Sequence, residues 1–314
     1  MDSFLLAMCS RLGPLAVLVV LGAAACGGSS TTATRSGGSL QRLAANHHPA
    51  QLIFGTSDYG PGRLRISFLL ARADGGLILQ PRAHIWIAAN DRSKTLASTV
   101  ARLETVTAPG ARVNSLGTKS LYVAHAEVDR PGSYSLLVEP IGGQRFAATA
   151  PLLVKQRTSA LAVGSMAPAP ATPTAASARG DLRSITTHVP PDRALLRYSV
   201  KDSLAAHKAF VLVFGTPAFC ANRTCGPIVD VVDAVRRRLR SGDVRFIHVE
   251  PFAAKNPGLG FDRWAKEWHI PSEPYTFLVG ADGRIKGEFE GSISVNELTA
   301  AVQSKLLHGS GVAS

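Results

Sequence analysis

The sequence AFVLVFGTPAFCANRTCGP, residues 209–227, indicates how the C-terminal half of this 314-residue chain folds. Its first six residues are all apolar, which is typical of a strand buried on both faces of a sheet. Cys220 and Cys225 follow, and Pro227 then stands at the first helical position, where helices accept proline. The pattern predicts a buried strand, a cysteine-bearing loop and the start of a helix.

The element types alternate downstream of this stretch. Apolar residues recur at helical spacing from Ile228 to Leu239, and Ala281-Asp282-Gly283-Arg284 is typical of a hairpin turn. We expect further strands at 244–249, 275–279 and 285–289, and further helices at 261–268 and 295–307. This order predicts an α/β domain over residues 191–309, with a mixed sheet covered on both faces.

Residues 49–155 show the pattern of an all-β domain. Gly62 to Phe68 alternates polar and apolar residues, and we expect further strands at 84–87, 121–128, 133–138 and 146–154. The run from Asp129 to Leu136 resembles the tyrosine corner of immunoglobulin-like sandwiches. That resemblance implies an immunoglobulin-like β-sandwich in which Tyr134 bonds back to upstream backbone and Trp86 is the core tryptophan.

The remaining segments have the composition of connectors and an export signal. Residues 156–190 are rich in Pro and Ala, which predicts a linker or an arm along the next domain. Residues 26–48 are predicted to be a flexible tether. Residues 1–25, with a short apolar run ending just before Cys26, resemble a bacterial lipoprotein signal peptide, and an ordinary cleaved secretory signal is the alternative.

This N-terminus determines the expected location and the state of the cysteines. The resemblance implies that Cys26 is acylated and that the chain is extracytoplasmic, lipid-anchored to the bacterial cell membrane, or secreted if the signal is simply cleaved. Cys9 would leave with the signal. Cys220 and Cys225 then remain, in a compartment where disulfides persist.

The composition excludes several other classes of protein. Hydrophobic residues make up 46% of the chain and charged residues 18%, which is globular composition. The chain has a net charge of +12, but its Arg and Lys residues are scattered among acidic residues. The one tight basic cluster is Arg236, Arg237, Arg238 and Arg240. No zinc-ligand spacing or RNA-binding aromatic motif accompanies it, so we expect no nucleic-acid partner, no metal and no cofactor.

The C-terminal half resembles the thioredoxin-like family over about 120 residues. The resemblance rests on the buried strand before Cys220, the run Cys225-Gly226-Pro227 opening a helix, Pro274 before the next strand, and the hairpin turn before the terminal helix. Val163 to Pro168 is also similar to the entry segment of exported, membrane-attached members. The resemblance implies that Cys220 attacks disulfides, that Cys225 resolves the mixed disulfide, and that Pro274 is cis and faces both.

The sequence departs from the family pattern in two respects. Four residues separate the cysteines, where the family usually has two, and Phe214 stands where the family often has a buried acid. A helix N-terminus lowers the pKa of a nearby thiol, and the longer loop leaves Cys225 nearer to it, so the choice of attacking cysteine stays open.

Three functions remain open for this half. The first is a cell-envelope thiol–disulfide oxidoreductase that exchanges disulfides with exported proteins through Cys220 and Cys225. The second is a redox-inert binding or scaffold lipoprotein in which a Cys220–Cys225 disulfide is structural. The third, a copper-handling relative, would need His248 or His269 as a ligand and has the wrong cysteine spacing. The proline feature favours exchange, because a structural disulfide needs no loop that faces a substrate.

Overall fold

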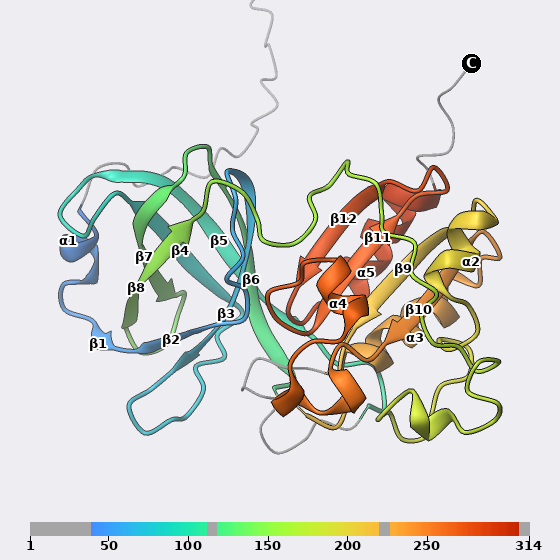
Figure 1. Cartoon of the computed structure of the whole chain (residues 1–314). Coiled ribbons are helices and arrows are strands. Elements are labelled where there is room, and N and C mark those ends of the chain that lie inside the picture. Colours follow the sequence, from blue (N-terminus) through green and yellow to red (C-terminus); the bar gives the residue numbers. More distant parts are fainter. Residues whose placement is uncertain (1–38, 112–117, 220–226, 308–314) are drawn as a thin grey trace, which may run out of the picture. The chain divides into compact units, whose positions relative to one another are not determined.

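The computed structural model describes residues 39–111, 118–219 and 227–307, all within one compact unit of the chain (Figure 1). All four cysteines lie outside these residues, so the structure gives no account of the predicted Cys220–Cys225 disulfide or of Cys26 acylation. The signal and most of the tether also lie outside them. Among the described helices, none has the length and apolar character needed to cross a bilayer.

The N-terminal half is built from strands, as the sequence predicts. Its elements are a short helix and eight strands: α1 (Leu40–Ala44), β1 (His48–Pro49), β2 (Gln51–Phe54), β3 (Gly62–Ala71), β4 (Arg82–Ala88), β5 (Thr95–Thr105), β6 (Ser120–Val128), β7 (Gly132–Pro140) and β8 (Phe146–Val154). The order β1-β8-β7-β4-β5-β6-β3-β2 makes one continuous sheet, antiparallel except where β1 pairs with β8.

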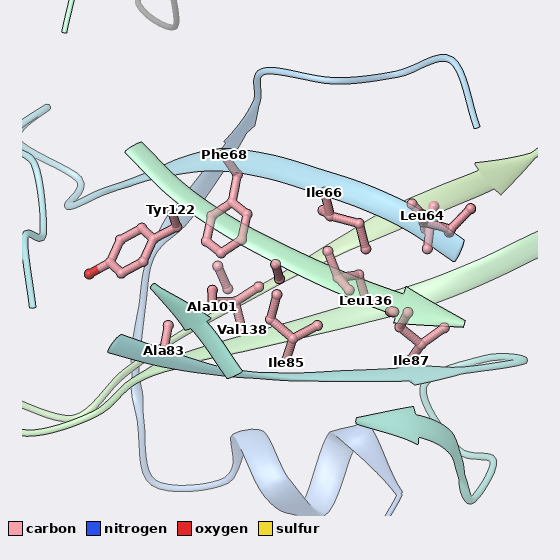
Figure 2. Packing of buried hydrophobic residues seen from close by; sticks show 14 of the residues in the cluster. Leu64, Ile66, Phe68, Ala83, Ile85, Ile87, Ala101, Tyr122, Leu136 and Val138 are labelled. Atoms are coloured by element: carbon pink, nitrogen blue, oxygen red, sulfur yellow. The ribbon is translucent and has the colours of Figure 1, made fainter. Parts of the chain in front are cut away.

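This single sheet corrects the expected immunoglobulin-like sandwich, which would have two facing sheets. The sheet instead curls on itself into a barrel-like form: side chains of β2 near one end and β8 near the other share one apolar cluster, and Tyr59 bridges to Val154. Figure 2 shows side chains from β3, β4, β6 and β7 meeting in this core. Closure of this kind reduces the exposed strand edges that an open sheet would have.

The two residues expected to mark a sandwich core have different outcomes. The Tyr134 hydroxyl donates to the Arg130 carbonyl oxygen at 2.8 Å, so the local corner bond is present. Trp86, however, lies outside the main core. Ile85 and Ile87 point into it, so period-2 alternation turns Trp86 to the other face, where it packs with Leu40 of α1.

The folded part of this half begins before residue 49, within the predicted tether. Ser39 caps α1 by accepting a hydrogen bond from the Arg42 amide, and Leu40 is fully buried. His47, in the predicted tether, forms a 2.9 Å hydrogen bond with Glu139. The apolar face of α1 thus covers the Trp86 side of the sheet.

The C-terminal half has the mixed sheet predicted from the sequence. Its regular elements are α2 (Val200–Ala205), β9 (Ala209–Phe214), α3 (Ile228–Leu239), β10 (Val244–Val249), α4 (Arg263–Glu267), β11 (Tyr275–Val279), β12 (Ile285–Glu290) and α5 (Val295–Val302), which continues into a π-helical turn (Gln303–Leu307). Three 3₁₀ turns also occur: η1 (Leu182–Ser184), η2 (Ala253–Lys255) and η3 (Pro257–Leu259).

The strand order β10-β9-β11-β12 makes one four-stranded mixed sheet in this half. β9 and β10 are parallel, whereas β11 is antiparallel to both β9 and β12. Val211 and Val213 of β9 pack with α3 and α5, while Phe210, Leu212 and Phe214 pack on the opposite face with α2 and α4. The apolar run that opens residues 209–227 is therefore buried on both faces.

The predicted linker follows the C-terminal half as an arm with defined contacts. Ala160 and Leu182 are buried, and Met166 pairs with Arg284 in a strand-like bridge. The Gly164 amide donates to the Ile285 carbonyl oxygen at 2.8 Å. Residues 156–190 were expected to form either a free linker or an arm along the next domain, and these contacts are those of an arm.

Candidate functional site around the cysteine segment

The described residues end at Phe219 and resume at Pro227, so both flanks of the cysteine segment are defined. β9 delivers the chain to Gly215, and α3 begins at Ile228 with Pro227 as its N-cap residue. A Cβ built on Gly215 would lie 3.0 Å from Ile228 Cγ2, so the described residues on the two flanks meet at the carboxyl end of β9. Parallel strands commonly carry functional loops at this edge.

The loop with Pro274 meets the first of these flanks. The Thr216 amide donates to Glu273 Oε2 at 3.0 Å, and the Glu273–Pro274 peptide bond is cis. A Cβ built on Gly215 would lie 3.9 Å from Pro274 Cβ. Pro274 is itself buried. Two stretches far apart in the sequence therefore lie against each other where the cysteine segment begins.

Gly215 also allows close packing against the start of α3. The same Cβ would lie 3.0 Å from Ile228 Cγ2, closer than side-chain carbons normally approach. The His248 ring donates from Nε2 to the Gly215 carbonyl oxygen at 2.9 Å, and burial lowers the pKa of His248. Burial thus favours the neutral form of the imidazole that contacts the backbone here.

The arm holds the first flank through Thr187. Thr187 Oγ1 accepts from the Ala218 amide at 3.1 Å and donates to Glu250 Oε1 at 2.8 Å. The Thr187 amide donates to the same Glu250 oxygen at 2.5 Å. One threonine therefore connects the chain just before Cys220 to the end of β10.

The next residue of the arm holds the second flank. His188 Nε2 lies 3.1 Å from Asp230 Oδ1, in the first turn of α3, and His188 Nδ1 lies 2.6 Å from the Pro190 carbonyl oxygen. The hydrogen bond to Asp230 raises the pKa of His188, which outweighs the opposing effect of burial. Thr187 and His188 together connect the arm to both ends of the cysteine segment.

Glu250 is a buried acid that joins this arrangement through Thr187, and no sequence motif marks it. Its side chain is buried, and its Oε2 has no hydrogen-bond partner among the described residues. Thr216 Oγ1 is buried and unpartnered in the same sense. The register of β10 with β9, which pairs Val249 with Phe214, could have placed Glu250 beside Gly215 once the parallel pairing was assumed.

Of the donors in the copper alternative, the two histidines lie within the described residues and the two cysteines do not. His248 uses Nε2 for the Gly215 carbonyl, and His269 follows the end of α4 with φ of 54°. Within residues 39–111, 118–219 and 227–307, no group of three or more His, Cys, Asp or Glu side chains could hold a metal ion.

The basic cluster predicted at the end of α3 is partly neutralised. Arg236 and Arg237 both pair with Asp233, at 2.6 and 2.9 Å, and Arg238 donates to the Asn296 side chain at 2.8 Å. Arg240 ends the helix in a left-handed conformation. These contacts give the cluster a structural role at a helix C-terminus, where cations are favoured.

Comparison with known proteins yields a likeness to solved structures. No family model matches the chain, and no curated protein matches it. Among solved structures, the chain is similar to a thiol:disulfide interchange protein, a thioredoxin family protein from Chlorobium tepidum TLS. The identity is 16% and the TM-score 0.27, and the match covers 44% of this chain and 99% of that one.

Proposed function

We propose that this protein is a thiol–disulfide oxidoreductase of the cell envelope, which exchanges disulfides with exported proteins through Cys220 and Cys225. The observation that carries the proposal is the contact between the Pro274 loop and the flank of the cysteine segment, through Thr216 and Glu273. This contact supports a substrate-docking role for the Pro274 loop, because it joins the loop to the residues just before Cys220.

The proposed reaction needs only the two thiols and a partner disulfide. A thiolate of the pair attacks one partner sulfur, which forms a mixed disulfide and releases the other partner sulfur as a thiolate that takes up a proton. The second cysteine then attacks the first within the mixed disulfide and releases the second partner thiol. Two electrons pass to the partner and Cys220–Cys225 becomes a disulfide, and the reverse sequence oxidises a partner dithiol.

The cysteine that attacks the partner disulfide must be a thiolate, so its surroundings should stabilise a negative charge. The amides at the start of α3 favour an anion close to Cys225, since the first N–H groups of a helix lack intrahelical partners. By resemblance Cys220 attacks, whereas the position of the helix favours Cys225. The trapping experiment below resolves this choice.

The test is trapping of the mixed disulfide with a defined partner. Purified Cys220→Ser and Cys225→Ser variants are incubated with a peptide that carries one disulfide, and adducts are measured by mass spectrometry. We expect one variant to retain a dithiothreitol-sensitive adduct, which identifies its remaining cysteine as the attacker. The double variant is the control for other chemistry, and absence of adducts from both single variants contradicts the proposal.

The second candidate is a redox-inert protein in which Cys220 and Cys225 form a structural disulfide. The wide cysteine spacing and the fully buried Phe214, where an ionisable side chain would assist proton transfer, favour this candidate. It predicts a protein that keeps its disulfide in thiol buffers and forms no adduct with peptide disulfides.

The proposal includes attachment to the outer face of the membrane through lipidated Cys26. The residues that support it are the apolar run and small residues before Cys26 and the polar run after it. Intact-mass measurement of the membrane-extracted protein tests it. An acylated N-terminal Cys26 is expected, and an unmodified N-terminus removes the anchor from the proposal while leaving the exchange activity to its own test.

A further inference from the structure

One contact between the N-terminal half, here called the β-domain, and the C-terminal half is made by the buried carboxylate of Glu290. The Ser57 amide donates to Glu290 Oε2 at 2.6 Å and the Ser57 hydroxyl to Oε1 at 2.9 Å. The Asp58 amide donates to Oε2 at 2.8 Å. Ser57 and Asp58 lie between β2 and β3, whereas Glu290 is the last residue of β12. One side chain thus receives three hydrogen bonds from the β-domain.

The same carboxylate also contacts the Pro274 loop. The Ser272 hydroxyl, two residues before Pro274, donates to Glu290 Oε1 at 2.8 Å. The Gly291 amide donates to the Pro274 carbonyl oxygen at 2.8 Å, and Glu290 pairs with Tyr275 in the β11–β12 register. Glu290 therefore lies between the β-domain and the loop that adjoins the cysteine segment.

A close backbone approach fixes this position further. Gly291 has φ of 75°, and a Cβ built on it would lie 2.2 Å from the Gly55 carbonyl oxygen. No side chain fits there, so only glycine lets residue 291 approach the β-domain so closely. The chain that leaves Glu290 is consequently held against Gly55.

A second contact between the halves does not involve the Pro274 loop. Arg65 of β3 donates to both carboxylate oxygens of Glu297 in α5, at 2.7 and 2.9 Å. Both side chains are largely buried. Arg65 also donates to the Glu290 and Ser292 carbonyl oxygens, at 3.3 and 2.9 Å. The Glu297 carboxylate makes none of the described contacts with residues 272–275, so it serves as the matched control for Glu290.

From these contacts we infer that Glu290 is a positioning residue through which the β-domain holds the Pro274 loop in place beside the cysteine segment. The inference rests on the proposed function for its catalytic consequence, and it gives the β-domain a part in the exchange of disulfides with protein partners. A small disulfide needs only the two thiols, whereas a polypeptide must also dock on the loop. Loss of the Glu290 contacts should therefore affect polypeptide substrates alone.

The experiment compares Glu290→Gln with Glu297→Gln in the full mature chain. Circular dichroism first confirms that each variant is folded, and Ser272→Ala provides a milder change at the loop if Glu290→Gln does not fold. For Glu290→Gln or Ser272→Ala we expect kcat/KM for a disulfide-containing peptide to fall about tenfold, because hydrogen bonds to a charged group are lost. The rate of exchange with a small aromatic disulfide, and the equilibrium constant of the Cys220–Cys225 couple with glutathione, should stay within about twofold of the wild type. Glu297→Gln should leave both substrates unaffected.

A second readout keeps the inference separate from the proposed function. Amide hydrogen exchange at residues 272–276 should be faster in Glu290→Gln or Ser272→Ala and unchanged in Glu297→Gln, whether or not the protein exchanges disulfides. Equal exchange at these residues in all variants overturns the inference. Equal loss of peptide activity in the Glu290 and Glu297 variants also overturns it, because Glu290 would then act only as a general contact between the halves. If wild type shows no exchange activity but the amide pattern is as expected, the proposed function fails and the positioning role remains.

Discussion

At the scale of single residues, the flanks of the cysteine segment are held by a few short contacts. The Thr216 amide donates to the Glu273 carboxylate, and the Ala218 amide donates to the Thr187 hydroxyl. His188 pairs with Asp230 at the start of α3. Pro274 and the cysteines could be singled out from the sequence because they recur in a familiar order. Thr187 and His188 could not, because the 156–190 composition is typical of a connector and carries no periodicity.

Gly215 offers a direct test of the packing at this point. Gly215→Ala adds a methyl 3.0 Å from Ile228 Cγ2 in a buried position, and we expect it to cost about 1–3 kcal/mol of unfolding free energy. Denaturant unfolding measures this cost. Gly242→Ala is the matched control, since nothing lies within 4 Å of its added Cβ, and it should change stability by less than about 0.5 kcal/mol. Equal effects of the two changes would contradict the packing described here.

At the scale of elements, long apolar runs were the most predictable features. The strands expected at 209–214, 244–249 and 275–279 form over those residues, because burial on both faces leaves a continuous apolar signal. β5 was not predicted, since most of its residues are half-buried or exposed and show no clean alternation. α2 was missed for a related reason: it has six residues, too few to show a helical period.

The β11–β12 hairpin contains a pair of side chains whose ionisation should affect stability. Burial raises the pKa of Glu288 to about 7, with the negative charges of Asp58 and Glu290 adding to the rise and the Tyr275 hydroxyl, 3.2 Å away, opposing it. Burial also raises the pKa of Tyr275. At a pH between 4.5 and about 7, the folded protein therefore keeps a proton on Glu288 that the unfolded chain has lost.

The sign of the pH effect follows from this difference. Where the native state holds more protons, the unfolding free energy falls as pH rises, here between the ordinary value of 4.5 and about 7. Glu288→Gln should remove this loss and flatten the slope, by an amount on the order of 1–3 kcal/mol across the interval. Urea unfolding at several pH values measures the slope. A slope as steep in the variant as in the wild type would exclude a perturbed Glu288.

At the scale of the whole molecule, the two halves are joined by buried polar contacts that the sequence does not reveal. Arg65 and Glu297 are 232 positions apart, and neither has a local pattern that indicates a partner. The sandwich expectation failed for a similar reason. Strand period and turn residues fix which face of a strand is buried, but one curled sheet and two facing sheets bury the same faces. Pairing between β1 and β8, or contact between β2 and β8, has no signature within either strand.

The Arg65–Glu297 pair predicts how strongly the halves depend on each other. Arg65→Ala leaves the largely buried Glu297 carboxylate unpaired, which we expect to cost about 3–5 kcal/mol of unfolding free energy. Arg63→Ala is the control, because Arg63 lies two residues away on the same strand and is exposed. It should change stability by less than about 0.5 kcal/mol. Thermal unfolding of both variants tests this, and matching melting temperatures would show that the pair contributes nothing.

The reduction potential of the Cys220–Cys225 couple, measured in the mature protein against glutathione buffers, separates an exchanging cysteine pair from a structural disulfide. If the cysteine segment beside Glu273 and Pro274 exchanges disulfides, its potential should lie between about −120 and −270 mV, the range of exchangers. A potential below about −300 mV would mark a structural disulfide and would contradict the account.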